Sequence, residues 1–169
     1  LADNIYTYFS KGEYETDLSS DTISVTKNNM AIHIKVLGRM KASEGLVMEI
    51  FGTCIGYSNS GEIIQGEFYH SPEALHIPTE VEDFYCFSTR VTRHPSDSPL
   101  YMKLSTKYPD SVGMDTLLEI SIQEKISQAG LSMSDSHLQD LYLTIDHSRS
   151  TISISVDHFN STNHVEVEF

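Results

Sequence analysis

Residues 22–37, TISVTKNNMAIHIKVL, decide the predicted fold, because apolar and polar side chains alternate on both sides of an asparagine pair. After the pair, every second residue is apolar, and the residues between them include His33 and Lys35. Period-two alternation of this kind is typical of a half-buried β-strand. Asparagine tolerates the positive φ of a tight turn, so Asn28-Asn29 predicts a β-hairpin across the whole stretch.

The same alternation recurs along the chain between short groups of turn residues. Residues 46–57 and 62–69 flank the sequence Ser58-Asn59-Ser60-Gly61 and predict a second hairpin. Further strands are expected at residues 83–93 and 100–106, and in a C-terminal three-stranded meander at residues 141–146, 151–156 and 165–169. The meander has one apolar face and one face rich in Ser, Thr and Asp, as in an antiparallel sheet with a solvated side.

Residues 115–131 fit two secondary structures. As a strand, Leu118 and Ile120 share an apolar face with alternating polar neighbours. As a helix, the segment is capped by Asp115 at its start, and Gly130 follows its last turn. The β-strand is the favoured interpretation.

Together these segments predict a mainly β fold, an antiparallel β-sandwich or jelly-roll-like domain of about nine or ten strands. One or two short helices are expected, one of them a capped helix within residues 134–141. The alternative is an α+β fold, in which helices pack on one face of an antiparallel sheet. No linker or low-complexity block divides the 169 residues, so residues 1–169 are expected to form a single β-rich domain.

The composition limits the classes of partner. Eleven basic and 24 acidic side chains give a formal net charge of −13, which repels phosphate backbones, so no direct nucleic-acid partner is expected. No stretch approaches the ~18 consecutive apolar residues of a membrane-spanning helix, so no transmembrane segment is expected. Phosphate-binding, dinucleotide, zinc and calcium motifs are absent, and we expect no cofactor and no resident metal.

The two cysteines, Cys54 and Cys86, have no zinc-site spacing. Free thiols inside strands are the favoured interpretation, because cysteine behaves as a small apolar residue in protein interiors. A disulfide between neighbouring strands stays an alternative for an exported chain, as does glycosylation at Asn160, which begins a sequon. The compartment therefore stays open.

Four histidines are the candidate site residues. His158 and His164 flank the last predicted turn, where a hairpin would bring them face to face across ~5 Å as a pH-responsive or metal-binding pair. His70 and His76 flank Pro72 in an irregular segment and are candidates for lining a cleft. The favoured interpretation of all four is exposed polar residues, since metal sites normally need three or four ligands.

Aromatic residues offer a second kind of candidate surface, for stacking against sugars or peptides. They form two sequence clusters: Tyr6, Tyr8 and Phe9, and Phe84, Tyr85 and Phe87. Alternate members of a strand more often belong to the core than to a binding surface.

The function predicted from these features is a non-enzymatic structural, self-assembly or protein-interaction module, for instance a viral matrix or capsid component. Its expected partner is another protein or a second copy of the chain. The first alternative is a carbohydrate- or ligand-binding β-sandwich of an exported protein. The second is a metal-assisted hydrolase that uses dispersed His and Asp residues.

Overall fold

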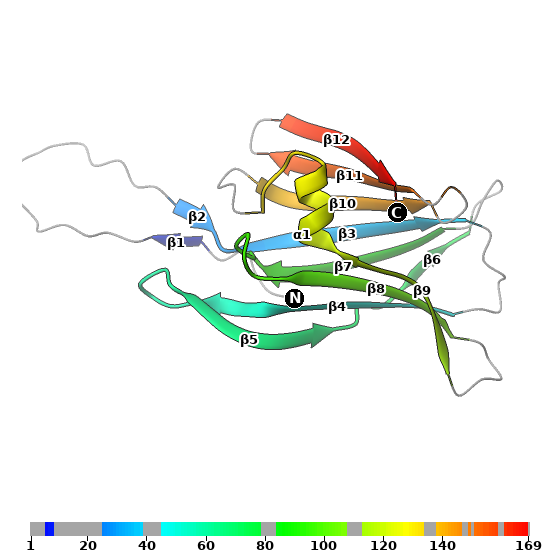
Figure 1. The fold of residues 1–169 in the computed structure, drawn as a ribbon, viewed down its shortest axis with the longest axis horizontal. Coiled ribbons are helices and arrows are strands. Elements are labelled where there is room, and N and C mark those ends of the chain that lie inside the picture. The colour runs from blue at the N-terminus through cyan, green and yellow to red at the C-terminus, as the bar shows by residue number, and fades with distance from the viewer. Residues whose placement is uncertain are drawn as a thin grey trace, which may run out of the picture.

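The computed structural model describes residues 6–8, 25–38, 45–78, 84–107, 113–133, 138–146, 149, 151–158 and 161–168. Most of them form two sheets that pack against each other (Figure 1). The first sheet has six strands in the order β12-β11-β10-β3-β7-β6, and the second has four in the order β5-β4-β8-β9. The prediction of a mainly β sandwich is therefore confirmed.

The strands of the six-stranded sheet are β3 (Asn29–Leu37), β6 (Leu75–Ile77), β7 (Phe84–Thr92), β10 (Leu138–Asp146), β11 (Thr151–His158) and β12 (Ser161–Glu168). Those of the four-stranded sheet are β4 (Gly45–Tyr57), β5 (Ile63–His70), β8 (Leu100–Lys107) and β9 (Met114–Ser121). A separate two-stranded pairing joins β1 (Tyr6–Tyr8) to β2 (Val25–Lys27).

The hairpin predicted across residues 22–37 is wrong. β2 pairs with β1, and β3 instead lies between β7 and β10. It is antiparallel to β7 and parallel to β10, with Ile32 in register with Leu141. Both edges of β3 are thus occupied by distant strands, which leaves no edge for β2.

The other predicted strands are confirmed with small shifts of their ends. β4 and β5 form the second hairpin, whose turn is closed by a hydrogen bond from the Ser58 amide to the Glu62 carbonyl, 2.8 Å. Gly61 in this turn has a φ of 82°, which few residues other than glycine adopt. The C-terminal meander is present as β10, β11 and β12 with antiparallel pairings.

The ambiguous segment contains both secondary structures in succession. β9 ends at Ser121, and helix α1 (Ile122–Gln128) follows at once (Figure 1). Ser121, not Asp115, caps the helix, since its hydroxyl accepts the Glu124 amide proton at 3.2 Å. Gly130, with a φ of 72°, follows the helix as predicted.

The predicted helix at residues 134–141 is wrong where the structure describes it. Residues 138–141 belong to β10, and residues 134–137 lie outside the described part of the chain. Among the described residues, α1 is the sole α-helix, and it lacks the length and apolar character needed to span a membrane.

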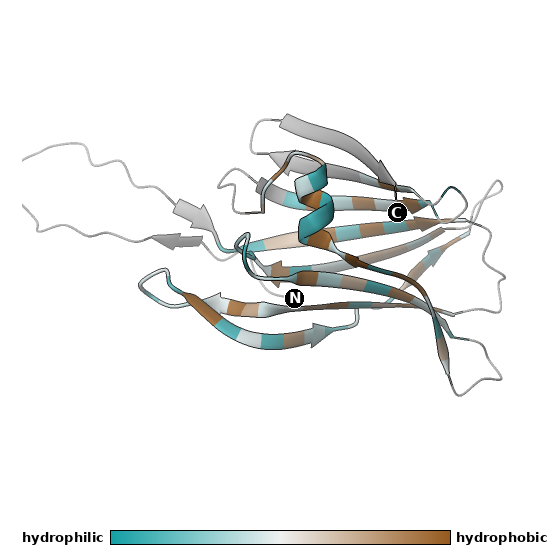
Figure 2. Cartoon of the chain, in the orientation of Figure 1, coloured by the Kyte–Doolittle hydropathy of each residue, from teal (hydrophilic) through white to brown (hydrophobic). Residues whose placement is uncertain are grey.

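The core fills the space between the two sheets. Brown and teal bands alternate along the strands that Figure 2 colours, as expected when one face of a strand is buried. Buried side chains come from both sheets and from α1; the fully buried large ones are Met30, Ile32, Ile34, Met48, Ile50, Leu100, Met102, Leu104, Ile122, Ile126 and Leu141. Even-numbered residues of β4 point into this core from position 46 to 54, so its odd-numbered residues face outward.

Candidate functional site

Three aromatic side chains lie in one row on the outer face of the four-stranded sheet. Tyr69 of β5 is in register with Phe51 of β4, and Phe51 is in register with Tyr101 of β8. The Phe51 and Tyr101 rings are stacked, with centroids 5.4 Å apart and planes 23° apart. Tyr69 is 63% exposed and Tyr101 is 37% exposed, so the row is open to solvent. We name these three residues the aromatic strip.

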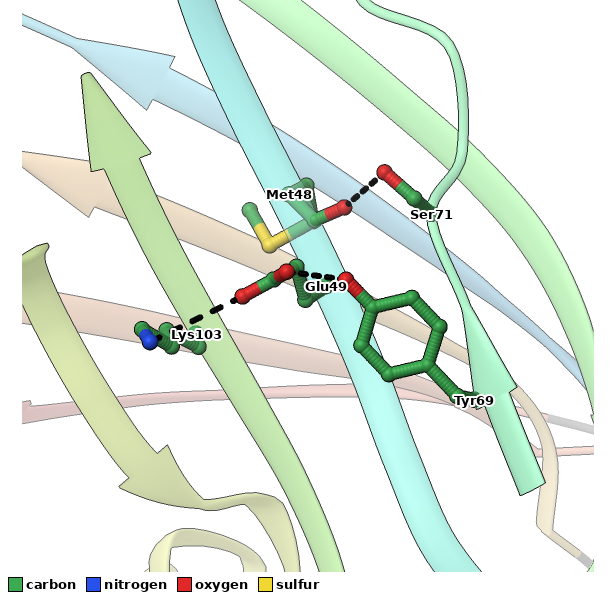
Figure 3. Close-up of polar contacts among 5 residues, drawn as sticks. All are labelled: Met48, Glu49, Tyr69, Ser71 and Lys103. Atoms are coloured by element: carbon green, nitrogen blue, oxygen red, sulfur yellow. Dashed lines mark hydrogen bonds and ion pairs between the residues drawn. The ribbon is translucent and has the colours of Figure 1, made fainter. Parts of the chain in front are cut away.

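A carboxylate beside the aromatic strip links the same three strands. The Tyr69 hydroxyl donates a hydrogen bond to Glu49, whose other oxygen lies 3.8 Å from the Lys103 ammonium nitrogen (Figure 3). The hydrogen bond to Glu49 raises the pKa of the Tyr69 phenol, because losing its proton would lose the bond. Ser71 donates to the Met48 carbonyl at 2.8 Å, which holds the chain after β5 against β4 (Figure 3).

A pocket of about 560 Å³ lies on this surface. Its lining consists of Phe51, Gly52, Thr53, Glu67, Phe68, Tyr69 and Tyr101. The whole aromatic strip is therefore part of the pocket, together with a carboxylate and a hydroxyl group. This combination of apolar rings with a few polar groups is typical of small-ligand sites.

Behind the aromatic strip, on the buried side of β4, lies a fully buried histidine. The His94 Nδ1 is 2.8 Å from the Thr92 carbonyl, which can only accept, so Nδ1 carries the proton. Nε2 then accepts a hydrogen bond from the Cys54 amide at 3.3 Å. Burial lowers the pKa of His94, in accord with this neutral form.

The space for His94 depends on Gly52. A Cβ at this position would lie 2.7 Å from the His94 Nε2, 2.8 Å from the Pro99 carbonyl oxygen and 3.0 Å from the Phe68 ring. Gly52 therefore lets the β7–β8 connection approach the back of β4 directly behind the aromatic strip.

A second pocket, of about 400 Å³, lies where the β4–β5 turn approaches β7. It is lined by Asn28, Asn29, Ile55, Gly56, Tyr57, Ser58, Asn59, Arg90, Val91 and Thr92. The Tyr57 hydroxyl donates to the Arg93 carbonyl at 2.7 Å and so ties the β4–β5 hairpin to the end of β7. We find no group of nucleophile, base and oxyanion donor in this lining.

The predicted face-to-face pairing of His158 with His164 is wrong. In the β11–β12 register, His158 is opposite Ser161 and His164 is opposite Ser155. The turn is shorter than predicted, because β11 ends at His158 and β12 begins at Ser161. The two histidines are therefore not cross-strand neighbours.

The other histidine candidates lie on different sheets. His70 ends β5, whereas His76 is in β6 with its ring stacked on Tyr85, centroids 4.8 Å apart. Both are exposed, and neither lines either pocket described above. Within the described residues, no three His, Cys, Asp or Glu side chains gather closely enough to hold a metal ion.

Both cysteines are free. Cys54 is buried, and burial raises the pKa of its thiol, which lies 3.6 Å from the Arg93 carbonyl. Cys86 is only partly buried.

The aromatic strip was missed by sequence reasoning, which singled out other aromatics. Of those, Phe87 is buried in the core, and Phe84 lies under the Lys35 ammonium group, 4.1 Å from its ring centroid. The side chains of Tyr6 and Tyr8 and the whole of Phe9 lie outside the described part. The available signal was the alternation of β4, which places Phe51 opposite the buried face of its strand.

The fold and site define a β-sandwich with a solvent-exposed aromatic surface on its four-stranded sheet. No protein-family model matches the chain, and no curated protein matches it.

Solved structures resemble the chain to different degrees. The chain is similar to the fimbrial anchor protein Mfa2 from Porphyromonas gingivalis, with a TM-score of 0.55 and 7% identity over 86% of this chain and 54% of that protein. A Bacteroides ovatus protein described as a candidate adhesin aligns with a TM-score of 0.48 and 10% identity, over 83% of this chain and 51% of that one. The chain thus spans about half the length of these two proteins. At 7% identity the likeness to Mfa2 shows the fold alone.

Proposed function

We propose that the chain is a non-enzymatic structural or protein-interaction module, which assembles with a protein partner or with copies of itself in a fimbria-like structure. The observation that carries this proposal is the edge strand β5. The fold shared with a fimbrial anchor protein supports it and suggests the kind of assembly.

β5 lies at one end of the four-stranded sheet, and among the described strands only β4 pairs with it. An edge strand presents a row of backbone donors and acceptors, and many proteins blunt such edges with charged residues. In β5 only Glu67 carries a carboxylate or ammonium group, and Ile63 and Ile64 are 37% and 44% exposed. Ile55 of the neighbouring strand is 50% exposed. This apolar edge is suited to accept a strand from a partner.

Sedimentation velocity over about a hundredfold range of concentration, with capture of partners on the immobilised chain, tests the proposal. We expect concentration-dependent assembly or capture of a partner, weakened by Ile64→Lys because a charge would be buried at the new strand pair. Met114→Lys is the matched control, since Met114 is 49% exposed on β9 at the opposite edge of the same sheet.

A chain that stays monomeric at every concentration and captures no protein would contradict the proposal. If Ile64→Lys and Met114→Lys weaken assembly or partner capture equally, β5 is not the assembly surface.

The viral matrix or capsid form of this hypothesis gains no support from the comparisons and stays a prediction. The metal-assisted hydrolase also stays a prediction. Its simplest pair of metal ligands was His158 with His164, and the strand register does not place these two residues opposite each other.

A further inference from the structure

The aromatic strip and its pocket have a chemistry that assembly through the β5 edge does not use. Stacked and exposed rings lie on the flat of the sheet, whereas strand addition needs only the backbone at its edge. We infer that this surface binds a neutral saccharide, a function beyond the assembly role.

The arrangement of the rings fits the faces of sugar rings. Neighbouring strands are ~4.8 Å apart, so the Cα atoms of Tyr69 and Tyr101 are separated by roughly 10 Å across three strands. That span is close to the length of a disaccharide. The C–H groups on one face of a pyranose form an apolar patch, which packs on aromatic rings much as other apolar groups do.

The rim of the pocket supplies partners for sugar hydroxyl groups. Glu67 and Thr53 line the same pocket as the rings. A carboxylate has two oxygens that accept hydrogen bonds from adjacent hydroxyls, and a threonine hydroxyl both donates and accepts. Glu49 and Lys103 extend this polar surface along the outer face beside Tyr69 (Figure 3).

The charges select a neutral ligand. Two carboxylates and one ammonium group border the rings, and the whole chain has a formal net charge of −13, so an acidic sugar is repelled. The same charged groups favour a saccharide over a protein here, because the centre of a protein–protein interface is depleted of charged residues.

Calorimetric titration with four neutral hexasaccharides, cellohexaose, chitohexaose, maltohexaose and mannohexaose, tests the inference, with hexagalacturonate as the acidic counterpart. We expect at least one neutral hexasaccharide to bind and hexagalacturonate to bind more weakly. Tyr101→Ala should weaken that binding about tenfold, because it removes the stacking ring. Tyr101→Phe keeps the ring and should stay within about threefold of the original affinity.

Tyr142→Ala is the control, because Tyr142 is also an exposed, stacked tyrosine but lies on β10 of the other sheet. It should leave the affinity unchanged, and thermal unfolding verifies that each variant is folded. Absence of binding for all four neutral probes at about 10 mM, or equal affinity of Tyr101→Ala and the original chain, overturns the inference.

The Ile64→Lys variant separates this inference from the proposed function. It should bind the saccharide normally even where assembly is lost. If Tyr101→Ala abolishes assembly while no probe binds, the strip is a protein contact and the saccharide inference is wrong.

Discussion

Gly52→Ala is expected to destabilise the sandwich at the contact between β4 and the β7–β8 connection. The new Cβ would lie 2.7 Å from the His94 Nε2 and 2.8 Å from the Pro99 carbonyl oxygen. The second contact is with backbone, so rotation of a side chain cannot relieve it. His94 must also move, which weakens its hydrogen bond from the Cys54 amide.

The magnitude follows from three terms. Overpacking of an interior costs about 1–3 kcal/mol. Loss of the buried hydrogen bond adds about 1 kcal/mol. Alanine also reduces the conformational entropy of the unfolded chain, which offsets about 0.4–1 kcal/mol of this loss. The net loss is about 2 kcal/mol, which lowers the unfolding midpoint by roughly 4–8 °C for a chain of this length.

Urea unfolding followed by far-ultraviolet circular dichroism measures this loss. Gly56→Ala is the control, because Gly56 lies on the same strand and a Cβ there meets nothing within 4 Å. The control should stay within about 0.5 kcal/mol of the original chain. If Gly52→Ala proves as stable as Gly56→Ala, the close approach of His94 and Pro99 behind β4 is wrong.

Three further predictions concern single groups. Burial lowers the pKa of His94 in the folded chain, so neutral His94 contributes its full stability above the unfolded pKa of ~6.5. As the pH falls from there toward the folded pKa, the free energy of unfolding decreases by up to ~1.4 kcal/mol per pH unit. Urea unfolding between pH 7.5 and 5.5 should show this loss in the original chain and a smaller one in His94→Gln. Ser121→Ala should cost about 1 kcal/mol through loss of the α1 cap, while Ser127→Ala, in the exposed part of the same helix, should cost nothing measurable in urea unfolding. Cys86 should react with a thiol reagent in the native protein, whereas Cys54, buried and with a raised pKa, should react only on unfolding; equal native rates would contradict its burial.

The strands were predictable because their signal is local. Alternation along residues 46–57 and the four-residue turn after them are enough to define the β4–β5 hairpin. The partners of β3 were not predictable in this way. Asn28-Asn29 is a good local turn sequence, but β3 is occupied on one side by β7 and on the other by β10, more than a hundred residues away. Pairing between such distant strands leaves no turn signal in the sequence.

The register determined which site residues meet. The prediction placed His158 opposite His164 because it assumed a longer turn between the two strands than the structure has. A change in turn length changes every cross-strand pair of residues. The aromatic strip shows the converse case. Phe51 and Tyr101 are separated by fifty positions, and only the β4–β8 pairing brings their rings together.

The two faces of β4 separate stability from binding. Because side chains alternate, Gly52 serves the buried contact with His94, whereas Phe51 and Glu49 serve the outer surface. A substitution at Tyr101 acts on the outer surface alone, so it should change saccharide affinity without a large change in stability. A substitution at Gly52 moves the backbone that carries Phe51, so it should reduce stability and affinity together. If Tyr101→Ala lowers the free energy of unfolding as much as Gly52→Ala does, the outer surface is part of the packing of the sheet and not a binding site.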